Sequence, residues 1–168
     1  KQAAVALTTI PGIGLISAQQ IVAEIGHDMS RFPSAAHLCK WAGVCPGNNE
    51  SAGKRKSGKT CYANKTLKST LAQCAQSAQK NKSSFFNAQY QRLIVRRGKG
   101  RANLAVAHSL LIAIYHVLQG SQFIDLGVNY YTQFNRDKKI NSYVKQLEKL
   151  GVSIPDDVLR SVTQTMSA

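Results

Sequence analysis

The sequence predicts an all-α protein in which a helix-hairpin-helix element is followed by a basic loop and a compact helical bundle. Apolar residues recur at spacings of three and four along most of the chain. No segment shows convincing alternation of period two, so no strand is expected. A chain of 168 residues with 43% apolar residues has enough length and apolar content to fold around a core without disulfide bonds or bound metals to stabilise it.

The first part, residues 1–30, is expected to be the helix-hairpin-helix element. A tight turn carries Pro11, Gly12 and Gly14, and the helix that follows it stops at Gly26. Two glycines allow backbone amides to approach a phosphate closely, and the following helix contributes its positive end. Gly12 and Gly14 are therefore candidate contacts to a nucleic-acid backbone. A plain helical corner, packed on its isoleucines, is the alternative.

The second part, residues 31–119, is expected to hold the core and a basic loop. Ser34 predicts the cap of a short helix that runs to Trp41. The loop covers residues 46–60, and further helices are expected at 65–79, 84–97 and 102–118. The last of these is apolar nearly all round, which places it at the centre.

The third part, residues 120–168, is expected to be a C-terminal helical extension. Residues 120–136 lack periodicity and predict an irregular connection. An amphipathic helix follows, and Pro155 is a candidate start for one more. The apolar residues of the amphipathic helix are Ile140, Tyr143, Val144, Leu147 and Leu150.

The distribution of charge predicts a nucleic-acid partner. The chain has 22 basic and 8 acidic residues, a net charge of +14. No acidic residue lies between Ser51 and Ile124, although that span carries thirteen basic ones. Solvated surfaces usually mix the two signs, whereas a block of one sign favours neutralisation of phosphates. The candidate binding residues are Lys54, Arg55, Lys56, Lys59, Lys65, Lys68, Arg96, Arg97, Lys99 and Arg101.

Residues 53–60 match the pattern of a nucleotide-binding phosphate loop, G-x-x-x-x-G-K-[ST], literally. That loop works only between a buried strand and a helix, and residues 46–51 predict no strand. No apolar run ending in an aspartate follows downstream to hold Mg²⁺. A flexible basic loop is the preferred interpretation, and an ATPase is the one set aside.

Other site classes have little support. No run of about 18 apolar residues predicts a membrane span. Neither the four cysteines nor the four histidines show metal-ligand spacing, and the acids are too scattered for a two-metal nuclease. No metal site or cofactor is therefore expected in this chain.

The order of several short motifs resembles the C-terminal domain of the DEDD-type insertion-sequence transposases, which include the pilin-gene-inverting recombinases. Each motif is weak alone, but their order and spacing extend over nearly the whole chain. They are Ile10-Pro11-Gly12-Ile13-Gly14, Ala23-Glu24-Ile25-Gly26, Arg31-Phe32, Trp41-Ala42-Gly43-Val44-Cys45-Pro46, Glu50-Ser51-Ala52-Gly53-Lys54, Ala63-Asn64, Leu67-Lys68, 102–111, Asp125-Leu126-Gly127, Tyr130-Tyr131 and 147–151.

The resemblance implies a recombinase in which this domain supplies a serine nucleophile. The family's Ser-Gly-Gly motif corresponds to Ser51-Ala52-Gly53, so Ser51 is the expected residue to form a phosphoserine link with DNA, and Ser57 is its rival. The resemblance also implies a separate N-terminal domain of resolvase type whose acids hold Mg²⁺. Two departures are Ala52, where glycine is usual, and Lys68, where arginine is commoner.

The implied partners are DNA, a structured guide RNA in some members, and further copies of the full-length protein, in the cytoplasm of a bacterium. The isolated chain is expected to bind nucleic acid without recombining it. A different class of function also remains open: a non-catalytic helix-hairpin-helix module that binds DNA or RNA. The two hypotheses differ in whether Ser51 is indispensable.

Overall fold

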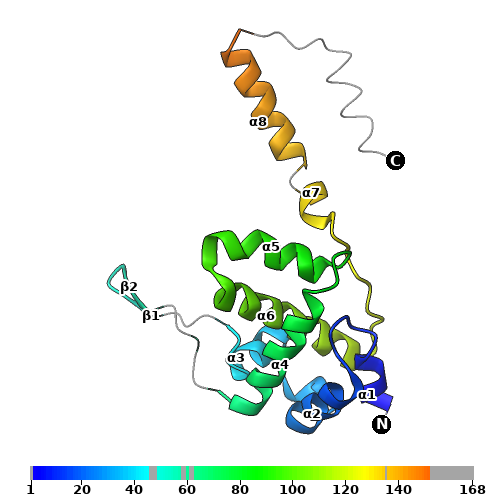
Figure 1. The fold of residues 1–168 in the computed structure, drawn as a ribbon. Helices are drawn as coiled ribbons and strands as arrows, with labels where there is room; N and C mark the ends of the chain where they lie inside the picture. The colour runs from blue at the N-terminus through cyan, green and yellow to red at the C-terminus, as the bar shows by residue number, and fades with distance from the viewer. Residues whose placement is uncertain (1, 46–48, 58–59, 61–62, 135, 152–168) are drawn as a thin grey trace. The chain divides into compact units, whose positions relative to one another are not determined.

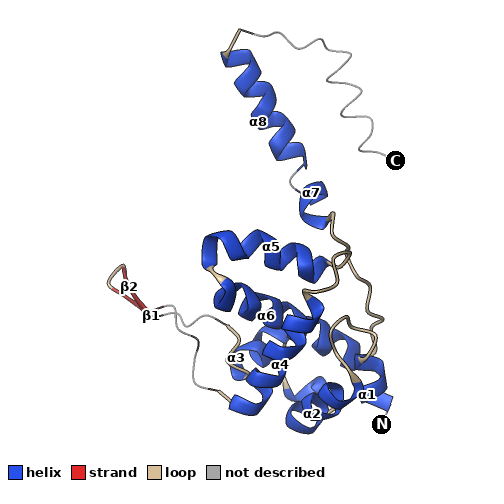
Figure 2. Cartoon of the chain, viewed as in Figure 1, coloured by secondary structure: helices blue, strands red, loops and turns tan. Residues whose placement is uncertain are grey.

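The computed structural model describes residues 2–45, 49–57, 60, 63–134 and 136–151, and it is mostly helical, as predicted (Figures 1 and 2). Contacts between residues divide the chain into two units, 1–129 and 130–168. The predicted division into three parts at residues 30 and 119 stays a prediction.

The first two helices are α1 (Gln2–Leu7) and α2 (Leu15–Ile25), joined by the turn that the sequence predicts. The hydroxyls of Thr8 and Thr9 donate to the carbonyls of Val5 and Ala6, at 2.7 and 2.8 Å, which satisfies the end of α1. A short 3₁₀ turn, η1 (Met29–Arg31), precedes α3 (Ala35–Trp41). Ser34 caps α3, as its sequence position predicts.

Three longer helices complete the first unit: α4 (Lys65–Ala78), α5 (Phe85–Arg97) and α6 (Lys99–Leu118). The side chain of Asn64 caps α4 and that of Ser84 caps α5. The sequence places the start of α6 three residues too late. Gly98, at φ +78°, ends α5 and also begins α6, so no linker separates the two helices.

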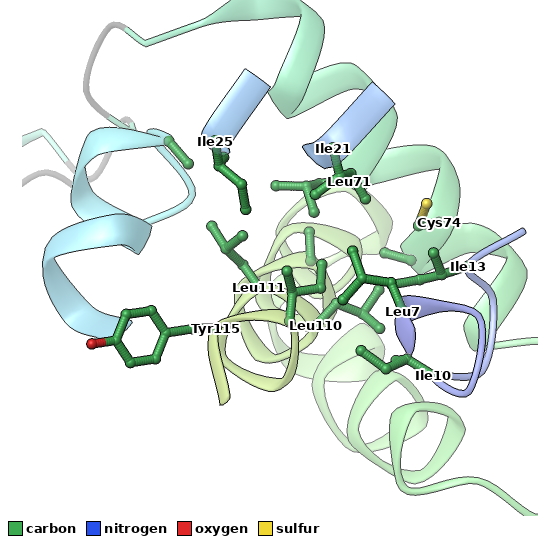
Figure 3. Close-up of a cluster of buried hydrophobic side chains, with 14 of the residues drawn as sticks. Leu7, Ile10, Ile13, Ile21, Ile25, Leu71, Cys74, Leu110, Leu111 and Tyr115 are labelled. Carbon is green, nitrogen blue, oxygen red and sulfur yellow. The ribbon is translucent and has the colours of Figure 1, made fainter. Parts of the chain in front are cut away.

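Helix α6 lies at the centre of the first unit, as its apolar surface predicts. It packs against α1, α3, α4 and α5. Leu110 of α6 lies near Leu7 and Ile10 from the first helix and turn (Figure 3). Leu111 lies on the side of Ile25 in the same buried cluster, and Tyr115 points away from Leu7 and Ile10. Every fully buried side chain of this cluster lies before residue 118. The core therefore belongs to the first unit.

By length and composition alone, Lys99–Leu118 is also apolar enough to cross a membrane, contrary to the prediction that no segment is. The helix contributes to the packed core, with Ala102, Val106, Leu110, Leu111 and Ile114 fully buried. Core helices of this kind commonly pass the same test, so we assign it to the core.

Residues 49–57 correct the prediction of a loop without strands. Strands β1 (Asn49–Ser51) and β2 (Lys54–Ser57) form an antiparallel hairpin, with Ser51 opposite Lys54 and Glu50 opposite Arg55. The strands are short and polar, so they carry no apolar alternation that could reveal them. The described part of the phosphate-loop pattern is thus a hairpin turn and a strand, which is a different geometry from a phosphate loop.

The second unit contains α7 (Tyr130–Phe134) and α8 (Arg136–Lys149). Helix α7 corrects the prediction that all of 120–136 is irregular, although residues 121–127 are so. In that stretch, Asp125 accepts hydrogen bonds from the amides of Phe85 and Gly127, at 2.8 and 2.9 Å. Helix α8 confirms the predicted amphipathic helix, while the helix predicted at Pro155 lies outside the described residues.

Candidate nucleic-acid interface and serine site

Ser51 is the last residue of β1, directly before the turn of the hairpin. The register pairs it with Lys54, the first residue of β2. Ala52 and Gly53 form the two-residue turn and, like Lys54, are exposed. The fold therefore places Ser51 directly before the turn of a hairpin, paired with a lysine.

The turn of this hairpin requires an unusual backbone. Ala52 has φ +49° and Gly53 has φ +75°, the left-handed combination that a two-residue hairpin turn of type I′ demands. Ala52 is the non-glycine residue at positive φ among those described. The family's usual glycine would adopt this conformation without the steric cost that the alanine Cβ adds.

Of the other basic residues in the hairpin segment, the structure describes two. Arg55 and Lys56 lie in β2 after Lys54. Lys59 lies outside the described residues. Thr60 is described, and its hydroxyl accepts a hydrogen bond from Nζ of Lys68.

Helix α4 begins directly after this segment and carries two of the predicted binding residues. Lys65 is exposed, whereas Lys68 is half-buried. The hydrogen bond to Thr60 gives Lys68 a structural contact that the sequence did not reveal. An ammonium group has three donors, so this contact leaves others for a phosphate.

A second group of basic residues surrounds the junction of α5 and α6. Arg96 and Arg97 end α5, Lys99 and Arg101 begin α6, and all four are exposed. We call these four residues the α5–α6 corner. They lie on either side of Gly98, whose φ of +78° reverses the chain within one residue. Four of the predicted binding residues are thus brought to one end of a helical pair.

The two glycines of the first turn differ in their surroundings. A methyl group on Gly12 would lie 2.4 Å from the backbone nitrogen of Ala78 and 2.6 Å from the carbonyl oxygen of Cys74. Gly12 therefore allows the turn to pack against α4. A methyl group on Gly14 would meet nothing within 4 Å, and Gly14 is exposed at the start of α2. Of the two, Gly14 is the more exposed, and the phosphate contacts predicted for both glycines stay predictions.

One hydrogen bond between two helices was not predicted from the sequence. Asn64, at the start of α4, donates from Nδ2 to Oε2 of Glu24, in the last turn of α2, at 2.5 Å. The asparagine before an apolar helical run signalled only its capping role. Its partner 40 residues away gave no local signal.

Burial shifts the pKa of two cysteines and one histidine among the described residues. Burial raises the pKa of the Cys39 thiol to about 12 and also raises that of Cys74, so both thiols stay protonated at neutral pH. Burial lowers the pKa of His108 below its usual 6.5, which keeps that imidazole neutral. Within the described ranges, no three His, Cys, Asp or Glu side chains gather as metal ligands.

A comparison with protein-family models decides the family. The model described as the Transposase IS116/IS110/IS902 family matches residues 4–91, just over half of the chain. The chain belongs to this family of transposases. A search of curated proteins found no significant match.

The range matched by the transposase family contains most of α1, all of α2 to α4, the hairpin with Ser51, and the first half of α5. The α5–α6 corner and the second unit lie beyond it. Membership assigns the chain to DNA transposition and makes DNA its partner, in agreement with the basic central block.

Proposed function

We propose that this chain is the DNA-binding, serine-nucleophile domain of a site-specific transposase of the DEDD type, related to the pilin-gene-inverting recombinases. Ser51 cleaves a DNA phosphodiester and carries the strand as a phosphoserine until transfer. The observation that carries the proposal is the place of Ser51 beside the turn of a hairpin, opposite Lys54, within the part of the chain that matches the transposase family.

The chemistry of the site supports this role. Oγ of Ser51 attacks the phosphorus, an Oγ–P bond forms, and the bond from phosphorus to one sugar oxygen breaks. The serine proton passes to a base and the departing sugar oxygen takes up a proton. In strand transfer a hydroxyl of another DNA strand attacks the phosphoserine and releases Ser51. The ammonium of Lys54 stabilises the charge on the non-bridging phosphate oxygens.

The metal of the reaction belongs elsewhere in this proposal. Mg²⁺ prefers clustered carboxylate oxygens, and the residues described here gather no such set. We therefore assign Mg²⁺ to a separate acidic domain of resolvase type and derive no step of this chain through it. A site assembled from two domains also favours a homo-oligomer of the full-length protein.

The basic residues hold the nucleic acid in place. Lys54, Arg55, Lys56, Lys59, Lys65 and Lys68 contact phosphates near the cleaved bond, and the α5–α6 corner contacts a second stretch of backbone. Such contacts position the duplex without selecting its sequence. A guide RNA is then a second partner that selects the target, and the protein works in the bacterial cytoplasm on DNA.

The test is recombination by the full-length protein in Mg²⁺ on its own recombination-site DNA. Ser51→Ala is expected to abolish recombination and keep DNA affinity, whereas Ser57→Ala recombines. If Ser51→Ala recombines like the wild type, the chain is a non-catalytic helix-hairpin-helix module that binds DNA or RNA. The serine-nucleophile proposal is then wrong.

A further inference from the structure

Glu24 and Asn64 join the end of one helix to the start of another. The Asn64 side chain makes three hydrogen bonds: Nδ2 donates to Oε2 of Glu24, and Oδ1 accepts from the amides of Thr66 and Leu67, at 2.9 and 3.2 Å. One amide group therefore caps α4 and ties it to α2. We call the contact between Glu24 and Asn64 the α2–α4 anchor.

The position of Glu24 is unfavourable within its own helix. It lies in the last turn of α2, where the helix dipole disfavours a negative charge. The start of α4 is positive, and Glu24 meets it through Asn64. Both side chains are half-buried, so a hydrogen bond to a carboxylate is stronger here than at an exposed site. The hydrogen bond to Asn64 therefore offsets the unfavourable position of Glu24 at the end of α2.

The anchor lies at the downstream end of the segment that carries Ser51. Asn64 is seven residues after Ser57, the last residue of β2, and Thr60 is only three residues after it. Thr60 is held in turn by Lys68, one turn into α4. Three residues span at most about 11 Å, so Ser57, at the end of the hairpin, lies no farther than about that distance from Thr60.

We propose that Glu24 and Asn64 are positioning residues for the serine hairpin: the α2–α4 anchor, with the contact between Lys68 and Thr60, fixes the point from which Ser51 is presented to DNA. The inference rests on the proposed function of Ser51. Neither anchor residue contacts the reacting atoms. Their effect is on where the nucleophile lies, and a displacement of about 1 Å can cost on the order of a hundredfold in rate.

The test uses the full-length transposase with Mg²⁺ and recombination-site DNA. Asn64→Asp keeps the oxygen that caps α4, removes the donor to Glu24 and places two carboxylates together. The double variant Glu24→Gln/Asn64→Asp exchanges donor and acceptor of this hydrogen bond, since the new amide at position 24 donates to the new carboxylate at position 64. Glu24→Gln alone keeps an acceptor for Asn64 and is the conservative control.

The measured quantity is the rate of the protein–DNA adduct in a single turnover at saturating DNA, beside the Kd for DNA and the Tm. Asn64→Asp is expected to slow the adduct by about tenfold or more with an unchanged Kd, and the double variant to recover to within about threefold of the wild type. An unchanged rate in Asn64→Asp, or no recovery in the double variant, overturns the proposal. If Asn64→Asp does not fold, Asn64→Ser, which keeps a capping hydroxyl and adds no charge, must show the same loss.

Hydrogen exchange of the amides of residues 49–57 separates this inference from the proposed function. Exchange is expected to be faster in Asn64→Asp and restored in the double variant, whether or not Ser51 reacts. If the wild type forms no adduct at Ser51, the proposed function fails and exchange still decides whether the anchor holds the hairpin. Unchanged exchange in Asn64→Asp, in a protein that does react through Ser51, overturns the anchor alone.

Discussion

Gly12 and Gly14 belong to the same turn, yet the structure gives them different tasks. Gly12 has φ +86° and its Cα faces the backbone of Ala78 and Cys74, while Gly14 has an ordinary φ of −85° and open space beside it. The motif of two glycines suggested one common purpose, close approach to a phosphate. Packing accounts for a glycine at position 12, and the phosphate contact predicted for the turn stays a prediction that Gly14 allows to be tested without disturbing the packing.

Substitution of these glycines separates packing from binding. Gly12→Ala is expected to lower the free energy of unfolding by about 2–5 kcal/mol, because it adds left-handed strain to a clash with the backbone of α4. Gly14→Ala is expected to leave stability nearly unchanged and to weaken DNA binding, since its methyl group stands where a phosphate would approach. Chemical denaturation and a DNA titration measure both. A Gly14 variant that binds DNA like the wild type contradicts the predicted phosphate contact at Gly14.

Ala52 offers a residue-scale test of the hairpin geometry. Ala52→Gly relieves a left-handed strain of roughly 1 kcal/mol and is expected to slow hydrogen exchange of the amides of residues 49–57. Ala52→Val is expected to speed that exchange, because a β-branched side chain disfavours positive φ. Global stability should move little in either variant, since the hairpin opens locally. The opposite order of exchange rates contradicts the turn described here.

At the scale of elements, the helices were predictable and the hairpin was not. The cap at Ser34 and the apolar stripe on α4 are local signals, so the sequence placed α3 and α4 within a few residues. The hairpin depends on a positive φ at Ala52. An Ala-Gly pair does not predict such a turn, whereas an Asn-Gly pair would. The α2–α4 anchor and the packing of Gly12 depend on contacts between distant parts of the chain, which no spacing reveals.

The α5–α6 corner carries the element-scale prediction about binding. Arg96→Gln/Arg97→Gln removes two charges from the corner and is expected to weaken DNA binding. The slope of the logarithm of DNA affinity against the logarithm of salt concentration should fall in magnitude by about one for each lost phosphate contact. Lys80→Gln/Lys82→Gln is the matched control, because both lysines are exposed just before α5, about 20 Å away along that helix. Titrations at several salt concentrations compare the two. Equal losses in both variants would mean that only net charge matters.

At the scale of the whole molecule, the core belongs to the first unit. The buried cluster runs from Ala4 to Val117, and α6 contacts four other helices of that unit. The strongly apolar pattern of 102–118 predicted this central role. It could not predict where the division between units falls, because residues 120–129 lack periodicity although Asp125 and Phe123 contact α5.

Removal of residues 130–168 tests this division. The remaining chain keeps every residue of the buried cluster, so its Tm is expected to stay within about 4 °C of the full chain's, equivalent to roughly 1 kcal/mol. Leu110→Ala in the same shortened chain is expected to cost about 2–5 kcal/mol, because it opens a cavity in a fully packed core. Thermal unfolding measures both. A shortened chain that melts far below the full one would show that the second unit stabilises the first.

The central claim is that Ser51 forms a covalent bond to DNA. The most direct measurement is peptide mass spectrometry of the adduct trapped when the full-length transposase meets nicked recombination-site DNA in Mg²⁺. A nucleotide is expected on the peptide that contains Ser51, absent from Ser51→Ala and present on Ser51 in Ser57→Ala. A nucleotide on another residue, or cleavage that persists in Ser51→Ala, would contradict it.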